Sequence, residues 1–389
     1  MQNNSTSLAD TCTLNYKPCP MHQAKLLWTN LAFFSITGLI TGIAAPLYAF
    51  LVGFDRWQLL IALLLLGYAG MSITMGYHRL WSHRSFEARW PVRALLAIGG
   101  TLAVQNSILH WSSDHREHHR HVDDNTRDPY SAGRGFWYSH IGWMLREYQP
   151  DRYHDYRNVA DLQTDPIVVW QHRHYWPLAW GVNLVLTGLL GILHGDLMGT
   201  LLLAGVARLT LSQHFTFFIN SLAHIWGRQT YSEQNSAKDN GLLALITYGE
   251  GYHNFHHRFA SDYRNGIRWW QFDPTKWAIA GLSWVGLTGN LKRIADERIE
   301  RARASLQMSK AKSRFEALPN AELLLSQLQA EYDSLLEKMS EFYTTRKRLL
   351  ECKRRSIESG ELAQRCRRLK SRWRQQRRYW NHFMRQSLA

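Results

Sequence analysis

The stretch Gln58–Tyr77, QLLIALLLLGYAGMSITMGY, runs for 20 residues without a charged side chain. A helix of about 20 residues crosses the hydrocarbon core of a bilayer, which is roughly 30 Å thick. The stretch Leu26–Leu51 is uncharged as well, and two comparable apolar stretches follow later in the chain. The sequence therefore predicts an all-α integral membrane protein with four transmembrane helices, at about 26–51, 58–77, 175–193 and 197–219.

A fifth apolar stretch, Val92–Ile108, is shorter and is interrupted by Gln105 and Asn106. Because histidine-rich segments flank it on both sides, we expect a helix at the membrane surface or packed beneath the soluble part. The fourth predicted span contains Arg208 and His214, which are costly in lipid unless they face protein or water.

Charge divides the chain into unlike parts. From Arg301 onward there are 21 Lys and Arg against 9 Asp and Glu, so about +12 of the net charge of +15 lies in the last stretch. The preceding 300 residues carry 25 basic and 22 acidic residues. We therefore predict a polar N-terminal segment at 1–24, a membrane-bound domain at 25–295 and a basic helical extension at 296–389.

The extension has helical periodicity. Apolar residues recur every three or four positions between Leu323 and Phe342, and a second run, Leu362–Met384, follows the turn signal Ser359-Gly360. This spacing predicts a helical hairpin or coiled coil. We interpret it as a solvated appendage or an oligomerisation arm. A nucleic-acid-binding tail and a tail that binds anionic membrane lipid are the alternatives.

The termini carry little further information. The four cysteines, Cys12, Cys19, Cys352 and Cys366, form no Cys-x-x-Cys pair, so we expect no disulfide framework. The polar segment up to about Gln23 lacks the pattern of a cleavable signal peptide.

Histidines form three clusters: His78-Arg-Leu-Trp-Ser-His83, His115-Arg-Glu-His118-His119 and His253-Asn-Phe-His256-His257. In the second and third clusters the i, i+3, i+4 spacing places the imidazoles on one face of a helix. A single triplet would equally suit surface histidines, but three clusters in one membrane chain favour a common site. Each follows an even number of predicted spans, so all three emerge on one side. Their Lys and Arg content places that side, and both termini, in the cytoplasm.

Eight imidazoles exceed the needs of one metal ion. Structural zinc sites favour cysteine and close at four ligands, and haem takes one or two histidines. The number of nitrogen donors therefore favours two metal ions with open positions. Iron, copper, zinc and nickel all accept imidazole, so spacing does not select the metal. A metal transporter would carry ionisable ligands within its spans, whereas these clusters lie outside the predicted ones.

At these residues the chain resembles the membrane-bound fatty-acid desaturases, specifically their acyl-CoA Δ9 (stearoyl-CoA type) branch. The flanking residues Asp128-Pro129, RGFWYSHIGW (134–143) and GEGYH (249–253) match as well, and the resemblance covers about 26–295. It implies four transmembrane helices under a cytosolic helical cap and a diiron (two Fe2+) centre. The implied activity is O2-dependent desaturation of a long-chain saturated fatty acyl chain, with a diiron fatty-acid or alkane hydroxylase as the alternative.

The resemblance also assigns residues. It adds His224, in the sequence Asn220-Ser-Leu-Ala-His224, as a ninth metal ligand, with Asn220 reaching a metal through water. Gln105, Trp111 and Thr216 match positions that shape the acyl tunnel, and Asn106 and Asp114 match positions that contact the headgroup. Leu66 and Gly70 are expected at the far end of the tunnel, where the small residue would leave room for a long chain. Carboxylates that could orient the histidines are Asp114, Glu117, Asp123, Asp124 and Glu250.

The chain departs from the family pattern in two places. Where animal members carry basic residues that meet the coenzyme A phosphates, this chain has Ser113, Glu147 and Tyr148, and Arg146 lies one position away as a possible substitute. The acyl carrier is therefore coenzyme A, a carrier protein or a lipid. No His-Pro-Gly-Gly haem motif is present, so we expect a separate electron donor such as a ferredoxin or a cytochrome b5-type protein.

Overall fold

The computed structural model describes residues 24–149 and 156–388. Nearly all of the predicted N-terminal segment, including Cys12 and Cys19, lies outside these residues. The described chain is mainly helical, which confirms the predicted fold class.

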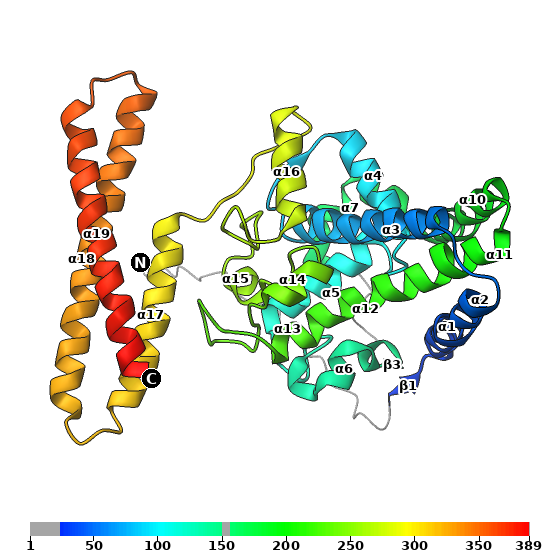
Figure 1. Cartoon of the computed structure of the whole chain (residues 1–389), viewed down its shortest axis with the longest axis horizontal. Helices are drawn as coiled ribbons and strands as arrows, with labels where there is room; N and C mark the ends of the chain where they lie inside the picture. Colours follow the sequence, from blue (N-terminus) through cyan, green and yellow to red (C-terminus); the bar gives the residue numbers. More distant parts are fainter. Residues whose placement is uncertain (1–23, 150–155, 389) are drawn as a thin grey trace, which may run out of the picture.

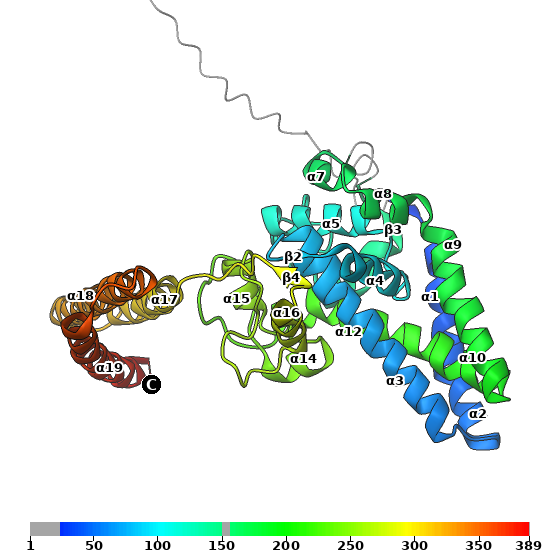
Figure 2. The same ribbon diagram turned by 90° about the horizontal axis from the view of Figure 1, so that it is seen from above.

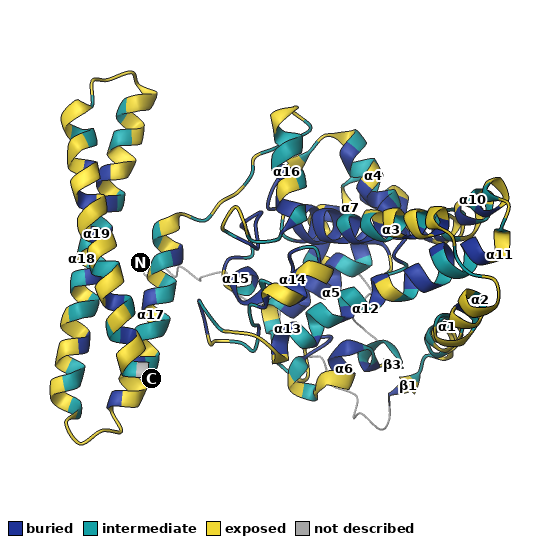
Figure 3. Ribbon diagram, in the orientation of Figure 1, coloured by how far each residue is buried: buried dark blue, intermediate teal, exposed yellow. Residues whose placement is uncertain are grey.

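Four helices are long and apolar enough to cross a membrane, and they match the four predicted spans: Trp28–Leu51, Arg56–Ser82, Tyr175–His194 and Leu197–Ile225. The second and fourth continue past the predicted ends, so they carry His78 and His224 in their last turns. Many of their large apolar side chains are exposed, and Figure 3 shows exposed stretches in yellow along α1, α2, α3 and α10. The bounds of the elements that form the spans are α1 Trp28–Leu39, η1 Ile40–Ala44, α2 Ala45–Leu51, α3 Arg56–Met71, η2 Ser72–Ser82, α9 Tyr175–Trp180, η7 Gly181–Val185, α10 Leu186–His194, α11 Leu197–Thr200, η8 Leu201–Ala207, α12 Arg208–Asn220 and α13 Leu222–Ile225.

Polar residues define the end of the spans that lies away from the histidine clusters. Asp55 caps α3 by accepting hydrogen bonds from the backbone N–H groups of Trp57 and Gln58, at 2.8 and 2.9 Å. Asp196, just before α11, accepts from Tyr48 Oη at 2.7 Å and from Gln58 Nε2 at 2.8 Å. The first, second and fourth spans are therefore tied together at this end.

Both costly residues of the fourth span face protein, as expected. The buried Arg208 guanidinium donates to the carbonyl oxygens of Ala204 and Leu102 at 3.0 and 2.8 Å, and to Asn183 Oδ1 at 2.7 Å. His214 Nδ1 lies 2.9 Å from His140 Nε2. Neither side chain is therefore left unpaired in lipid.

The fifth apolar stretch does not span. Helix α4, Trp90–Thr101, has 12 residues, or about 18 Å of rise, which is too short to cross a bilayer. The expected helix is also shorter than its apolar stretch, because positive φ angles at Val104 and Asn106 break the chain before α5 begins. Helix α4 packs against η2, where the absence of a side chain at Gly100 admits the Tyr77 ring.

A cap of short helices covers one end of the spans (Figure 1). Its elements are α5 Ile108–His121, η3 Ala132–Arg134, α6 Phe136–His140, η4 Gly142–Met144, η6 Arg157–Val159, α7 Ala160–Gln163, α8 Pro166–Arg173, α14 Gly241–Ile246, α15 His253–Arg258 and α16 Pro274–Trp284. Two antiparallel strand pairs tie the cap together: β1 Lys25–Leu26 with β3 Arg146–Glu147, and β2 Glu87–Ala88 with β4 Thr288–Gly289.

The C-terminal extension consists of α17 Asp296–Phe315, α18 Ala321–Arg354 and α19 Gly360–Leu388. The start of α18 packs against the end of α19, through Leu335 and Trp380 for example, so the two helices form the antiparallel hairpin that the spacing predicts. Helix α17 packs on this hairpin as a third helix, which the sequence interpretation did not distinguish. Figures 1 and 2 both place α17 between the hairpin and the cap.

Candidate metal centre

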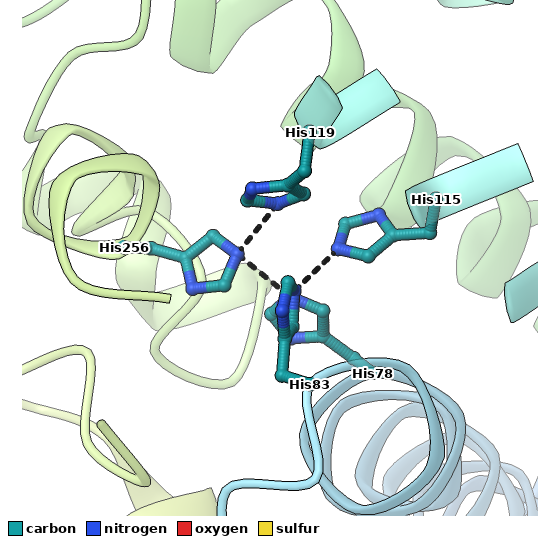
Figure 4. A group of neighbouring side chains, drawn as sticks. All are labelled: His78, His83, His115, His119 and His256. Carbon is teal, nitrogen blue, oxygen red and sulfur yellow. Dashed lines mark hydrogen bonds between the residues drawn. The ribbon is translucent and has the colours of Figure 1, made fainter. Parts of the chain in front are cut away.

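Nine histidines converge in two neighbouring groups, where the cap meets the ends of the second and fourth spans. In each group the potential ligand nitrogens lie within 4.8 Å of one another. The first group, whose rings point toward one another in Figure 4, contains His78, His83, His115, His119 and His256. The second contains His118, His224, His253 and His257. The eight histidines of the three clusters and His224 are thus brought together as predicted.

A π-helical segment explains how the first cluster converges. In an α-helix, residues five apart lie about 140° apart around the axis. In η2 the backbone N–H of His83 instead donates to the carbonyl of His78 at 3.0 Å. The wider i→i+5 turn brings His83 over His78, so both rings enter the first group.

The three histidines of each triplet do not all enter the same group. On α5, His115 and His119 are four residues apart and join the first group, whereas His118 joins the second. On α15, His253 and His257 join the second group and His256 joins the first. Each helix therefore lies between the two groups and contributes to both.

The separations within the groups suit metal coordination. Neighbouring Nε2 atoms lie 2.8 Å apart for His83 and His115, 3.0 Å for His119 and His256, and 3.1 Å for His224 and His253. Two nitrogens bound at right angles about 2.1 Å from one ion would lie about 3.0 Å apart. Both groups thus have the spacing of donors that share an ion.

Polar partners at the opposite ring nitrogens of three histidines direct lone pairs toward the groups. His118 Nδ1 lies 2.9 Å from Asp128 Oδ1, and His78 Nδ1 lies 2.9 Å from Glu250 Oε2. His224 Nδ1 donates to Ser236 Oγ at 2.8 Å. An imidazole that donates through Nδ1 presents a lone pair at Nε2. Several lone pairs converging without protons between them repel one another unless a cation lies among them, so the residues present fit a metal centre.

Burial keeps six of the nine imidazoles neutral, as ligation requires. Desolvation holds the pKa values of these six well below the ordinary range: His83, His115, His119, His253, His256 and His257. Their lone pairs are therefore available to a metal near neutral pH.

Some of the carboxylates predicted to orient the histidines contact a histidine of the two groups, directly or through a hydroxyl, and the others do not. Glu250 reaches His78 directly, and Asp123 Oδ1 accepts from Ser236 Oγ at 2.6 Å, so it acts on His224 through that hydroxyl. Glu117 instead lies 3.2 Å from His121, and Asp124 accepts from Thr126 within a turn. Asp114 Oδ2 lies 4.0 Å from His110 Nε2.

Sequence reasoning missed Asp128 as a partner of His118. In the sequence Asp128 stands in the Asp128-Pro129 pair, ten residues beyond the histidine. Helix α5 ends at His121, and the turn that follows folds back to place the carboxylate against the ring. Spacing within one helix carries no signal for such a contact.

A buried ionic network supports the first group. Arg79 donates to Glu250 Oε1 at 2.8 Å, to the Tyr263 carbonyl oxygen at 2.8 Å and to Asp273 Oδ2 at 3.2 Å. Burial opposes ionisation of Glu250, but the charges and hydrogen bonds of His78 and Arg79 outweigh it and hold its pKa below the ordinary value. Glu250 thus stays an acceptor for His78.

A model of the family described as "Fatty acid desaturase" matches residues 55–283, a stretch that contains all nine histidines. The chain belongs to the fatty acid desaturase family. "Probable acyl-CoA desaturase" of Schizosaccharomyces pombe is 43% identical over 281 residues, covering 72% of this chain and 58% of that protein. "Acyl-CoA desaturase 1" of Saccharomyces cerevisiae is 47% identical over 234 residues, covering 60% and 46%. The chain thus spans about half the length of these two relatives.

"Stearoyl-CoA desaturase 5" of Bos taurus is 36% identical over 290 residues, covering 73% of this chain and 84% of that protein.

Three of the residues that the desaturase resemblance assigns to the acyl tunnel form a connected chain. Gln105 Nε2 donates to Thr216 Oγ1 at 2.9 Å, and Trp111 Nε1 donates to Gln105 Oε1 at 3.3 Å. The Trp111 ring stacks on His115 with 4.8 Å between centroids. The three side chains therefore lie together beside the first histidine group.

The structure gives the positions of the other predicted substrate and site residues without indicating a role for them. Asn106 is exposed in the break before α5, Asp114 is buried on α5, and Asn220 is the last residue of α12. Arg146, in β3, donates to the Ala24 carbonyl at 2.9 Å. Their roles toward substrate or metal remain predictions.

The space expected at Gly70 is filled. A β-carbon built on Gly70 would lie 2.1 Å from a ring carbon of Tyr248, and Tyr248 Oη donates to the Leu66 carbonyl at 3.1 Å. The missing side chain at Gly70 thus accommodates an aromatic ring of the protein itself. The interpretation that it leaves room for a long acyl chain is therefore wrong for this position.

The contact between Asp128 and His118 leads to a test. We expect Asp128→Asn to lower metal affinity about 10- to 100-fold, because a neutral amide polarises the ring less than a carboxylate does. Metal content after dialysis against a chelator measures the effect. Asp124→Asn, on the adjacent exposed turn, is the matched control and should retain its metal. Equal retention in both variants would contradict the role of Asp128.

Proposed function

We propose that this protein is an O2-dependent desaturase of long-chain saturated fatty acyl chains. The observation that carries the proposal is the pair of histidine groups, five and four imidazoles, next to the side chains of Gln105, Trp111 and Thr216. A nitrogen-rich centre for two metal ions beside a prospective acyl site suits oxidation of an unactivated hydrocarbon.

The reaction needs an oxidant that no side chain provides. A methylene pair loses two hydrogens, and O2 takes these together with two electrons and two protons from outside, giving a double bond and two waters. Two bound ferrous ions would supply the activation of O2. Within our proposal the nine histidines are the ligands, and Asn220 reaches one ion through water.

The remaining roles fall to residues that orient the ligands and the chain. Glu250, Asp128 and the Asp123–Ser236 pair hold His78, His118 and His224 in the ring orientation that ligation requires. Gln105, Thr216 and Trp111 would position the acyl chain beside the first group. Because the Trp111 ring stacks on His115, a shift of the Trp111 side chain would also move this proposed metal ligand.

For the substrate we propose an acyl-CoA desaturated at the Δ9 position. The names of the two yeast relatives and of the bovine relative support acyl-CoA. "Delta(9)-fatty-acid desaturase fat-7" of Caenorhabditis elegans, 35% identical over 285 residues, supports the position. Asn106, Asp114 and Arg146 are the proposed headgroup contacts. Electrons would come from a separate ferredoxin or cytochrome b5-type donor.

We further propose that the cap and both termini face the cytoplasm and that 296–389 is an accessory unit attached to a membrane-bound domain at 25–295. The Lys and Arg content of the cap segments supports this orientation. The hairpin of α18 and α19 remains a candidate oligomerisation arm.

Expression in a host that lacks Δ9 unsaturated fatty acids tests the function. We expect new monounsaturated chains with the double bond at Δ9, measured by mass spectrometry with double-bond localisation. A host carrying the empty vector is the control. With the centre loaded and a donor present, saturated lipids alone would contradict the proposal, and hydroxylated chains would support the hydroxylase instead.

A further inference from the structure

A cleft of about 550 Å³ opens between the extension and the cap, away from the histidine groups. Its walls come from the segment 264–270 and from α17, α18 and α19. The volume lies within the usual range of small-molecule sites, roughly 300–1,000 Å³. The cleft therefore has the volume of a small-molecule site.

The lining of the cleft is strongly basic. Six cations line it, with two carboxylates, Asp296 and Glu300. The cations are Arg264, Arg268, Arg346, Lys370, Arg374 and Arg377.

The carboxylates neutralise only part of this charge. Arg346 pairs with Asp296 at 3.2 Å and Arg377 with Glu300 at 2.9 Å, and Arg264 pairs with Asp262 behind the wall. Among the residues that the structure describes, the other three, Arg268, Lys370 and Arg374, have no carboxylate partner. Three unneutralised cations around one concave surface create a potential that favours a polyanion.

Aromatic rings complete the walls. Trp270 is 57% exposed, and the Arg268 guanidinium lies 5.1 Å from its ring centroid. Trp373 stacks on Phe342 with 5.3 Å between centroids and 7° between planes, and Arg377 lies 5.4 Å from the Trp373 centroid. An exposed indole beside free cations offers a stacking surface for a planar ring that carries phosphates.

We propose that this cleft binds a nucleotide that carries two or three phosphates. The phosphates would meet Arg268, Lys370 and Arg374, and the base would stack on Trp270. Ile299, which lines the cleft, also packs with Phe255 and Phe259 at α15, the helix of the third histidine cluster. A bound nucleotide would thus hold the extension against the helix that carries three of the nine histidines.

Calorimetry on the full chain in phosphatidylcholine nanodiscs tests the proposal, with ATP, tripolyphosphate, inorganic phosphate and adenosine as probes. We expect saturable one-to-one binding of ATP, at least tenfold weaker binding of tripolyphosphate and of inorganic phosphate, and no binding of adenosine. Trp270→Leu should weaken ATP binding and leave tripolyphosphate binding unchanged. ATP and tripolyphosphate binding equally would overturn the nucleotide assignment. Weaker ATP binding in a second set of nanodiscs that also contain anionic lipid would assign the site to a lipid headgroup and overturn it too.

Two double variants separate the site from general attraction to a basic helix. Lys370→Gln with Arg374→Gln removes cations of the cleft, and we expect at least a tenfold loss of ATP affinity. Arg372→Gln with Arg378→Gln removes two exposed cations of the same helix outside the cleft, and we expect less than a twofold change. Equal losses, or no saturable binding to the wild type, would overturn the proposal. All four side chains are exposed, so folding should be retained.

Discussion

Replacing His119 or His257 by alanine is expected to reduce desaturation to less than about 1% of the wild-type rate, while the protein still inserts and folds. Removing one ligand takes a nitrogen donor from the ion and opens an extra position on it, and even the loss of a residue that merely orients a ligand costs about 10- to 100-fold. The two variants should differ in bound metal. Loss of His119 leaves four imidazoles in the first group, whereas loss of His257 leaves three in the second. The His257 variant is therefore expected to lose more metal, measured by elemental analysis of the purified chain.

His121 provides the matched control for this experiment. It lies on α5 two residues beyond His119, but it belongs to neither group and lies 3.2 Å from Glu117. His121→Ala should keep its metal and nearly all of its activity. Wild-type turnover in the His119 or His257 variant would overturn the assignment of these residues as ligands.

The spans and the convergence of the histidines could be predicted because both depend on local properties of the sequence. An uncharged run such as Gln58–Tyr77 has few structures available other than a membrane helix. The count of spans then places the clusters at one end. How α5 divides His115 and His118 between two groups depends on the position of α15, far along the chain, and no spacing within α5 contains that information.

The features that the sequence does not reveal are contacts made by turns and by segments far apart in the chain. Asp128 reaches His118 only because the chain reverses after His121. The size of Gly70 alone suggests open space, but its neighbour is the ring of Tyr248, 178 positions later. A small residue indicates that something approaches closely, without indicating what approaches.

The second large effect is expected at Arg79. We expect Arg79→Met to destabilise the fold by about 3–5 kcal/mol, the cost of breaking a buried ion pair by removing one partner. Arg79 is only 1% exposed and holds Glu250 and Asp273, both buried, as well as the Tyr263 carbonyl. Without the guanidinium, two carboxylates face each other with no cation between them. Unfolding of the solubilised chain in denaturant, followed by circular dichroism, measures the loss.

Arg84→Met is the matched control, since it removes the same charge from a nearby position. The Arg84 side chain is 67% exposed and lies 3.7 Å from Asp161, so its removal should cost less than about 1 kcal/mol. The Arg79 variant should also bind metal less tightly. Without the guanidinium, the charge of Asp273 would repel Glu250 and push it away from His78. Equal stability of the two variants would show that Arg79 is not what keeps the two carboxylates together, and the orientation of His78 would then need another cause.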